Sequence, residues 1–116
     1  MAWLSFLLTA FVAVEHVGFL ILEMFFWTKP IGLKVFNQTP EAAGSSAVLA
    51  ANQGLYNGFL AAGLIWALST ARPDVAIFFL CCVVVAGVFG AMTVKPRIFL
   101  VQGLPALLAL AALYIR

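Results

Sequence analysis

Charged residues are scarce in this sequence, where six bases and four acids make up only 9% of 116 residues. Ordinary soluble domains carry about a quarter, so ten charges cannot cover a water-soluble surface or build a basic face for nucleic acid. The composition, with only two cysteines, also excludes a secreted disulfide scaffold, and the adjacency of Cys81 and Cys82 disfavours an ordinary disulfide. The apolar fraction of 66% excludes disorder and, with a mean hydropathy of +1.16, indicates an integral membrane protein.

Four stretches are long and apolar enough to cross a membrane, which takes about 20 mostly apolar residues. They cover residues 2–27, 47–68, 75–93 and 98–115. The first lacks a basic start and carries Glu15 and His16, so we expect a retained span and not a cleaved signal. Because the second and third connections are short, neighbouring helices should be antiparallel. The predicted fold is an all-α, four-transmembrane-helix antiparallel bundle that forms one domain over residues 1–116.

Prolines mark the expected ends of these helices. Pro73 should stop the second span while Asp74 caps the third, and Pro96 lies where the fourth helix would begin. Residues 39–41 read Thr-Pro-Glu, a hydroxyl cap followed by proline and an acid, so the second helix should begin before the membrane. Pro105 lies within the fourth span and should free the carbonyl four residues earlier.

The long connection over residues 28–46 keeps apolar residues beside Lys29 and Lys34. We expect it to be an interfacial segment that lies among the lipid headgroups, with its lysines reaching toward phosphate. Basic residues also indicate orientation, since four lie on one side of the membrane and two on the other. The first side holds Lys29, Lys34, Lys95 and Arg97, and the second holds Arg72 and Arg116. This excess predicts that both termini lie outside, and it is also compatible with insertion in both orientations.

Polar side chains within the spans are concentrated on three helices. They are Glu15, His16 and Glu23 in the first span, Asn52, Gln53, Tyr56 and Asn57 in the second, and Gln102 in the fourth. Each costs several kcal/mol in hydrocarbon unless it finds a partner, so such groups mark functional sites. A polar zipper that fixes helix register would explain the amides, but it explains two glutamates and a histidine poorly. We therefore interpret the set as a ligand- or proton-binding site.

Helical spacing predicts how these groups meet. His16 and Glu23 lie two turns apart on one face, and the four polar residues of the second span form a stripe that should face the first helix. Burial disfavours the charged form of a carboxyl, and histidine titrates near neutrality, so the first helix could exchange protons. We expect no metal site, because His16 and Glu23 have Cα atoms about 10 Å apart along the helix axis. The sequence does not identify a cofactor.

Small residues at spacings of four predict close helix packing. Gly54, Gly58 and Ala62 form one such stripe, and the third span repeats it with Gly87 and Ala91, or with Ala86 and Gly90. The stripes serve contacts within one chain or between subunits, and the sequence leaves both open. Since four short helices leave little room for a pore, transport would require a homo-oligomer.

Several runs of the sequence resemble a known family. They read Glu-Met-Phe-Phe-Trp-Thr-Lys-Pro at 23–30, Lys-Val-Phe at 34–36, Thr-Pro-Glu at 39–41 and Ala-Ala-Asn-Gln-Gly-Leu-Tyr-Asn-Gly-Phe-Leu-Ala-Ala-Gly at 50–63, with Gln-Gly-Leu-Pro at 102–105. In these runs the chain resembles the DUF1304 family of small bacterial membrane proteins. The resemblance implies a four-span protein of the bacterial cytoplasmic membrane, and it implies no activity.

Three functions are compatible with this pattern. The leading hypothesis is a proton-linked binder or transporter of a small amphipathic or cationic molecule. The second is a membrane-embedded enzyme that acts on a lipid, quinone or other hydrophobic substrate, with His16 and Glu23 as acid and base. The third is a structural or accessory membrane subunit. In each case the expected partners are membrane lipid, a small hydrophobic or cationic ligand, and further copies of the chain, with no nucleic acid.

Overall fold

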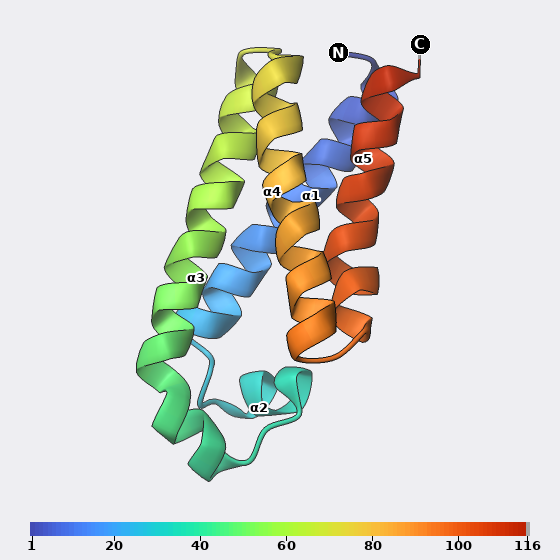
Figure 1. Ribbon diagram of the computed structural model, residues 1–116. Helices are drawn as coiled ribbons and strands as arrows, with labels where there is room; N and C mark the ends of the chain where they lie inside the picture. The colour runs from blue at the N-terminus through green and yellow to red at the C-terminus, as the bar shows by residue number, and fades with distance from the viewer. Residues whose placement is uncertain (116) are drawn as a thin grey trace. The chain divides into compact units, whose positions relative to one another are not determined.

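The computed structural model describes residues 1–115, and all regular secondary structure in them is helical. The elements are α1 (Trp3–Met24), α2 (Pro30–Phe36), α3 (Pro40–Ser69), α4 (Pro73–Thr93), the π-helical turn η1 (Phe99–Gly103) and α5 (Leu104–Tyr114) (Figure 1). The prediction of an all-α fold is confirmed. Helices α1 and α4 are long and apolar enough to cross a membrane, and Phe99–Tyr114 forms a shorter apolar helix.

Helix bounds differ from the predicted spans mainly at two places. The first span was expected to continue to Trp27, but α1 ends at Met24 and the next residues form turns. Helix α3 begins seven residues before the second predicted span, at Pro40, where Thr39 Oγ1 accepts a 3.1 Å hydrogen bond from the backbone N–H of Ala42. The predicted start of this helix is therefore confirmed. Arg116, which entered the orientation count, lies outside the described residues.

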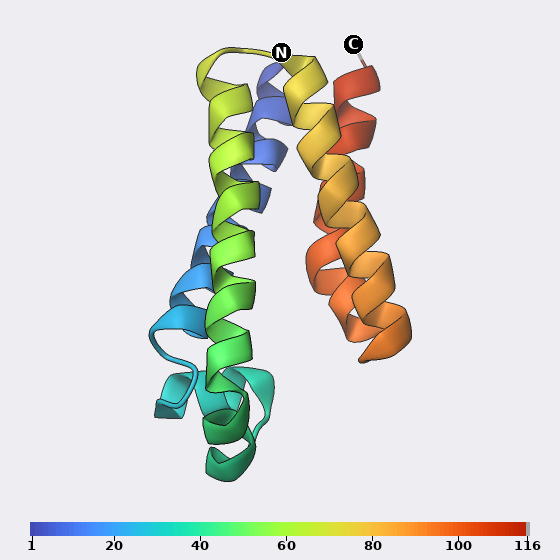
Figure 2. The same cartoon turned by 60° about the vertical axis from the view of Figure 1, so that its left-hand side comes forward.

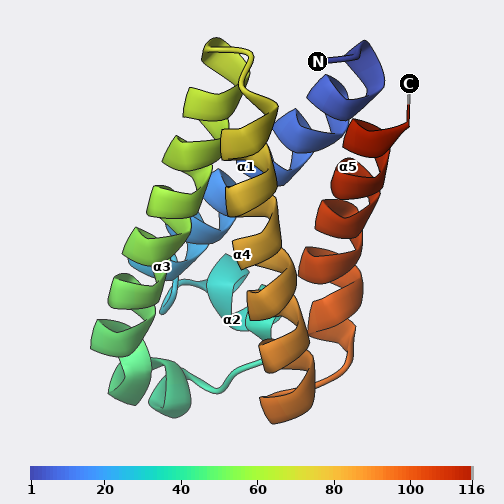
Figure 3. The same ribbon diagram turned by 45° about the horizontal axis from the view of Figure 1, so that its top comes forward.

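The chain forms two compact units, and the larger unit combines Met1–Val14 with the described residues from Leu60 onward. Helices α4 and α5 lie side by side in this unit, and the two marked chain ends lie at the same end of it (Figures 1 and 3). Its core consists of fully or almost fully buried apolar side chains: Val12, Ala13, Leu64, Ala67, Val75, Ala76, Leu80, Val83, Ala106 and Ala109. Many are alanine or valine, which lets the helices approach closely.

Two glycines show how close that approach is. A Cβ atom on Gly87 of α4 would lie 2.8 Å from both the Cα and the N of Gly103, which belongs to η1. A Cβ on Gly63 would overlap the ring of Phe79. Gly87 therefore belongs to a contact between backbones, as predicted for the small residues of this helix.

The start of α4 corrects one prediction. Asp74 does not cap the helix, because Pro73 takes the first helical position and places Arg72 at the N-cap, which makes no side-chain capping bond. Asp74 instead forms an exposed ion pair with Arg72, with 2.7 Å between Nη2 and Oδ2. An acid in the first turn still interacts favourably with the helix dipole.

The disturbance predicted around Pro105 takes the form of a π-helical turn. Helical structure resumes directly after Pro96, and η1 then occupies Phe99–Gly103. The N–H of Leu104 bonds to the carbonyl of Phe99, five residues back. Because proline has no N–H to donate, a locally wider turn is one way for the helix to accommodate it.

The smaller unit covers Glu15–Phe59. Helix α2 lies beside the first turns of α3 (Figures 1 and 2). The indole N–H of Trp27 donates a 3.1 Å hydrogen bond to Ser46 Oγ, and its ring packs on Phe36 with 4.8 Å between centroids. A Cβ on Gly32 would overlap the carbonyl oxygen of Phe26, so α2 touches the turn that follows α1. These contacts fix α2 within the unit.

Candidate functional site

A hydrogen bond between α1 and α3 is the central polar contact of the smaller unit. Asn57 Nδ2 donates to Glu23 Oε1 at 2.5 Å, and Asn57 is only 6% exposed. Glu23 lies in the last turn of α1 and Asn57 near the middle of α3. The structure thus joins one acid of the first predicted span with one amide of the second.

Two glycines of α3 make this contact possible. A Cβ on Gly54 would lie 2.6 Å from Met24 Cγ, and a Cβ on Gly58 would lie 2.6 Å from Leu20 Cδ1. Because neither glycine has a side chain, the last two turns of α1 lie directly on the backbone of α3. The predicted packing role of Gly54 and Gly58 is confirmed, whereas Ala62 is exposed.

The prediction that the whole polar stripe of α3 faces α1 is wrong. The buried face of this part of α3 consists of Ala43, Ala50, Gly54, Asn57 and Ala61. At about 100° per residue, Gln53, Tyr56 and Asn52 point about 80°, 140° and 180° away from the centre of that face. All three are exposed, with Tyr56 at 59%. Close packing of small residues determines the rotation of the helix and leaves Asn57 at the edge of the contact.

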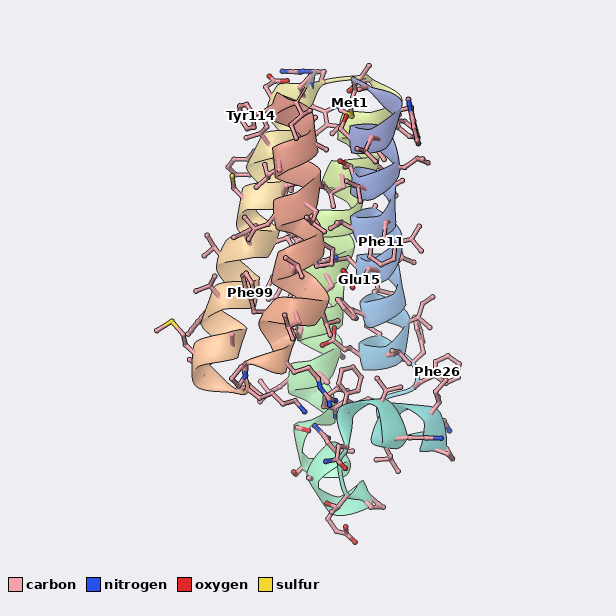
Figure 4. The ribbon with its side chains drawn as sticks, turned by 90° about the vertical axis from the view of Figure 1, so that its right-hand side faces the viewer. Met1, Phe11, Glu15, Phe26, Phe99 and Tyr114 are labelled. Atoms are coloured by element: carbon pink, nitrogen blue, oxygen red, sulfur yellow. The ribbon has the colours of Figure 1, made fainter. Side chains whose placement is uncertain are left out.

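Glu15 and His16 lie about two turns before Glu23, toward the N-terminus of α1. Glu15 is half-buried, and its Oε1 is buried with no hydrogen-bond partner among residues 1–115 (Figure 4). His16 has no exposed surface, and its ring meets the edge of Phe19 with 5.2 Å between centroids. Since α1 is continuous, His16 and Glu23 lie two turns apart on one face. Gln102 belongs to the larger unit, where it is half-buried in η1.

The polar groups of the smaller unit have little opposite charge near them. Among the described residues 15–59, no lysine or arginine forms an ion pair with Glu15 or Glu23. The amide of Asn57 supplies one hydrogen bond to Glu23 Oε1, and the second carboxylate oxygen accepts no hydrogen bond from a described side chain of that unit. A carboxylate in this state can bind a cation or a hydrogen-bond donor, or it can take up a proton.

Two surface hollows occur in the larger unit, and neither includes a predicted site residue. One of about 480 Å³ is lined by Met1, Ala2, Ser5, Pro73, Ala112, Leu113 and Ile115. The other, about 320 Å³, is lined by Trp66, Asp74, Val75, Phe78 and Phe79. In the part of the chain that the structure describes, no three His, Cys, Asp or Glu side chains are grouped to hold a metal ion.

Comparison with known proteins identifies the family. The profile of DUF1304, "Protein of unknown function (DUF1304)", matches residues 10–114 of the chain. The chain belongs to the DUF1304 family. A similar protein from Lactococcus lactis subsp. lactis (strain IL1403), "Uncharacterized protein YpaA", is 34% identical over 114 residues, which cover 95% of this chain and 96% of that protein. No solved structure matches the chain.

The DUF1304 resemblance seen in the sequence is thus confirmed, and the structure shows where its motifs lie. The runs at 23–30 and 50–63 contain Glu23, Asn57 and both glycines of the α1–α3 contact. The first run also contains Trp27, whose hydrogen bond to Ser46 was not predicted. No pattern in the sequence indicates that Trp27 contacts Ser46. The contact depends on the path of the chain between α1 and α3, which places the indole against one side of α3.

Proposed function

We propose that this DUF1304 protein is an integral membrane protein that binds a small amphipathic or cationic molecule at Glu23 and exchanges it for a proton. One observation carries the proposal: a carboxylate at the end of an apolar helix, held by the Asn57 amide, with no lysine or arginine paired to it among residues 15–59. Placing a carboxylate there is costly, and a packing role alone would be met by an amide or a hydroxyl.

The exchange follows from the chemistry of the contact. An ionised Glu23 attracts a cation, and a protonated Glu23 releases it, so binding and protonation compete for one oxygen pair. Asn57 holds the carboxylate in place and leaves the other oxygen for ligand. Glu15 offers a second carboxylate on the same helix, whose Oε1 has no hydrogen-bond partner among the described residues. His16 is proposed to pass protons along α1. We further assign the exposed Asn52, Gln53 and Tyr56 to ligand entry in the smaller unit, and Gln102, in the larger unit, stays a separate predicted ligand contact.

The proposal includes a membrane topology with four spans. Besides α1 and α4, the apolar part of α3 over residues 47–68 and the segment 98–115 would cross the bilayer as one antiparallel bundle. Residues 28–46 would lie at the interface, with both termini outside the bacterial cytoplasmic membrane. Since four short helices enclose little space, we propose that transport takes place in a homo-oligomer.

Binding of a defined cation tests the function. With tetraphenylphosphonium as an amphipathic probe and the detergent-solubilised full chain, calorimetry should show affinity that falls as pH is lowered. In the E15A/E23A double variant, affinity should drop about tenfold, which corresponds to about 1.4 kcal/mol, and the pH dependence should disappear. E23Q removes the negative charge, so it should lose affinity for the cation. It keeps an oxygen that can accept the Asn57 hydrogen bond, so it should remain folded.

The matched control is E41Q, which removes an exposed acid from the first turn of α3. It should bind the probe like the wild type. If E15A/E23A binds with unchanged affinity and unchanged pH dependence, the proposed site is wrong. A product formed from membrane extract by the wild type and lost in His16→Ala would support the enzymatic alternative instead. Full tolerance of Glu23→Gln in every assay would support a structural subunit.

A further inference from the structure

Helix α2 lies close to the end of α1. The backbone N–H of Lys29 bonds to the carbonyl of Phe26 at 3.0 Å, so the connection turns back instead of extending. Gly32 of α2 touches the same carbonyl group of Phe26. Phe26 lies only two residues after Met24, the last residue of α1. Two residues reach at most about 7 Å, so a membrane boundary at the end of α1 places α2 in the headgroup layer.

The outward side of α2 combines apolar and basic side chains. Ile31 and Val35 are one turn apart and 54% and 55% exposed, and Lys34 lies beside them, also exposed. Lys29 immediately precedes the helix, and Phe26 projects outward next to it (Figure 4). No acidic residue occurs between Glu23 and Glu41. Apolar side chains flanked by lysines fit the boundary between acyl chains and phosphates.

The other side of α2 is fastened to the protein. Gly32 is buried against the turn, and Phe36 packs on the ring of Trp27, which is itself bonded to Ser46 of α3. These contacts position the backbone of α2, from which Lys34 projects, next to the end of α1. Helix α2 is therefore a positively charged helix that packs on the rest of the unit through Gly32 and Phe36.

We propose that α2 binds the phosphate headgroups of anionic phospholipids, with Lys29 and Lys34 as the binding residues. The two ammonium groups complement the lipid charge, while Ile31 and Val35 enter the acyl boundary. Each lysine near an anionic surface contributes about a fivefold increase in binding, equivalent to about 1 kcal/mol. This inference rests on the membrane location in the proposed function, but it does not depend on any ligand at Glu23.

Fluorescence quenching tests the headgroup preference. In the W3F/W66F background, Trp27 is the sole tryptophan and reports on lipids beside α2. The full chain is reconstituted in phosphatidylcholine vesicles with either brominated phosphatidylglycerol or brominated phosphatidylcholine as a minor component. Phosphatidylglycerol should quench Trp27 more strongly than its share of the vesicle predicts. The additional K29Q/K34Q substitutions should reduce this preference about 25-fold, about fivefold for each lysine.

The matched control is K95Q/R97Q, which removes two positive charges from another connection and should keep the excess quenching. K29R/K34R should keep it as well, and soluble glycerophosphate should not compete. The inference is overturned if both lipids quench equally, if the excess survives in K29Q/K34Q, if K95Q/R97Q loses as much, or if glycerophosphate displaces the lipid. A chain that fails to resist carbonate extraction from the vesicles would instead overturn the membrane location itself.

Discussion

At the scale of single residues, Asn57 differs from its polar neighbours on α3. Asn52, Gln53 and Tyr56 are exposed, whereas Asn57 is buried and donates to Glu23. A buried acceptor that loses its donor is desolvated without a compensating hydrogen bond, and this lowers the free energy of unfolding by about 1–3 kcal/mol. The stability of the α1–α3 contact should therefore depend on Asn57 far more than on the other three.

Alanine substitutions measure this difference. Asn57→Ala should lower the free energy of unfolding by about 1–3 kcal/mol, because Glu23 is left without its hydrogen bond. Asn52→Ala is the matched control on the exposed side of the same helix, and it should change stability by less than about 0.5 kcal/mol. Both are read from reversible unfolding of the full chain in one detergent. Equal effects would show that the Glu23–Asn57 bond contributes little.

At the scale of helices, glycine determines where two backbones meet. In the smaller unit, α1 packs closely on α3 at Gly54 and Gly58. In the larger unit, η1 packs closely on α4 at Gly87. The Gly87 contact is the more demanding, since its nearest neighbours are backbone atoms of Gly103 that cannot rotate away as a side chain could. By contrast, no described atom outside the adjoining residues and the helix's own backbone lies within 4 Å of a Cβ added at Gly18 or Gly44.

This contrast predicts opposite results for the same substitution. Gly87→Ala should destabilise the protein by about 1–3 kcal/mol, because α4 and η1 must separate to admit the methyl group. Gly44→Ala should leave stability unchanged or raise it by up to about 1 kcal/mol, because alanine favours the helix and meets open space. Thermal unfolding of the two variants under identical conditions checks both. A Gly87→Ala variant as stable as Gly44→Ala would contradict the backbone contact.

At the scale of the whole molecule, local signals were predictable and the rotation of α3 was not. A helix start depends on the few residues around it, so the sequence correctly predicted the helix starts at Thr39, Pro40 and Pro96. The same reasoning failed at Asp74, because proline in the first helical position moved the cap to Arg72. The face that α3 buries depends on the volumes of two helices together, which the spacing of Asn52, Gln53, Tyr56 and Asn57 could not reveal. Their roles in a ligand site stay predictions.

Native mass spectrometry of the whole protein, released from its own membrane in mild detergent, tests the central claim most directly. We predict that the wild type retains a small amphipathic or cationic molecule, that Glu23→Ala lacks it, and that Glu41→Gln keeps it. The same spectra give the number of chains in the assembly, which we predict to exceed one. A molecule retained equally by wild type and Glu23→Ala would contradict the assignment of Glu23 as the binding residue.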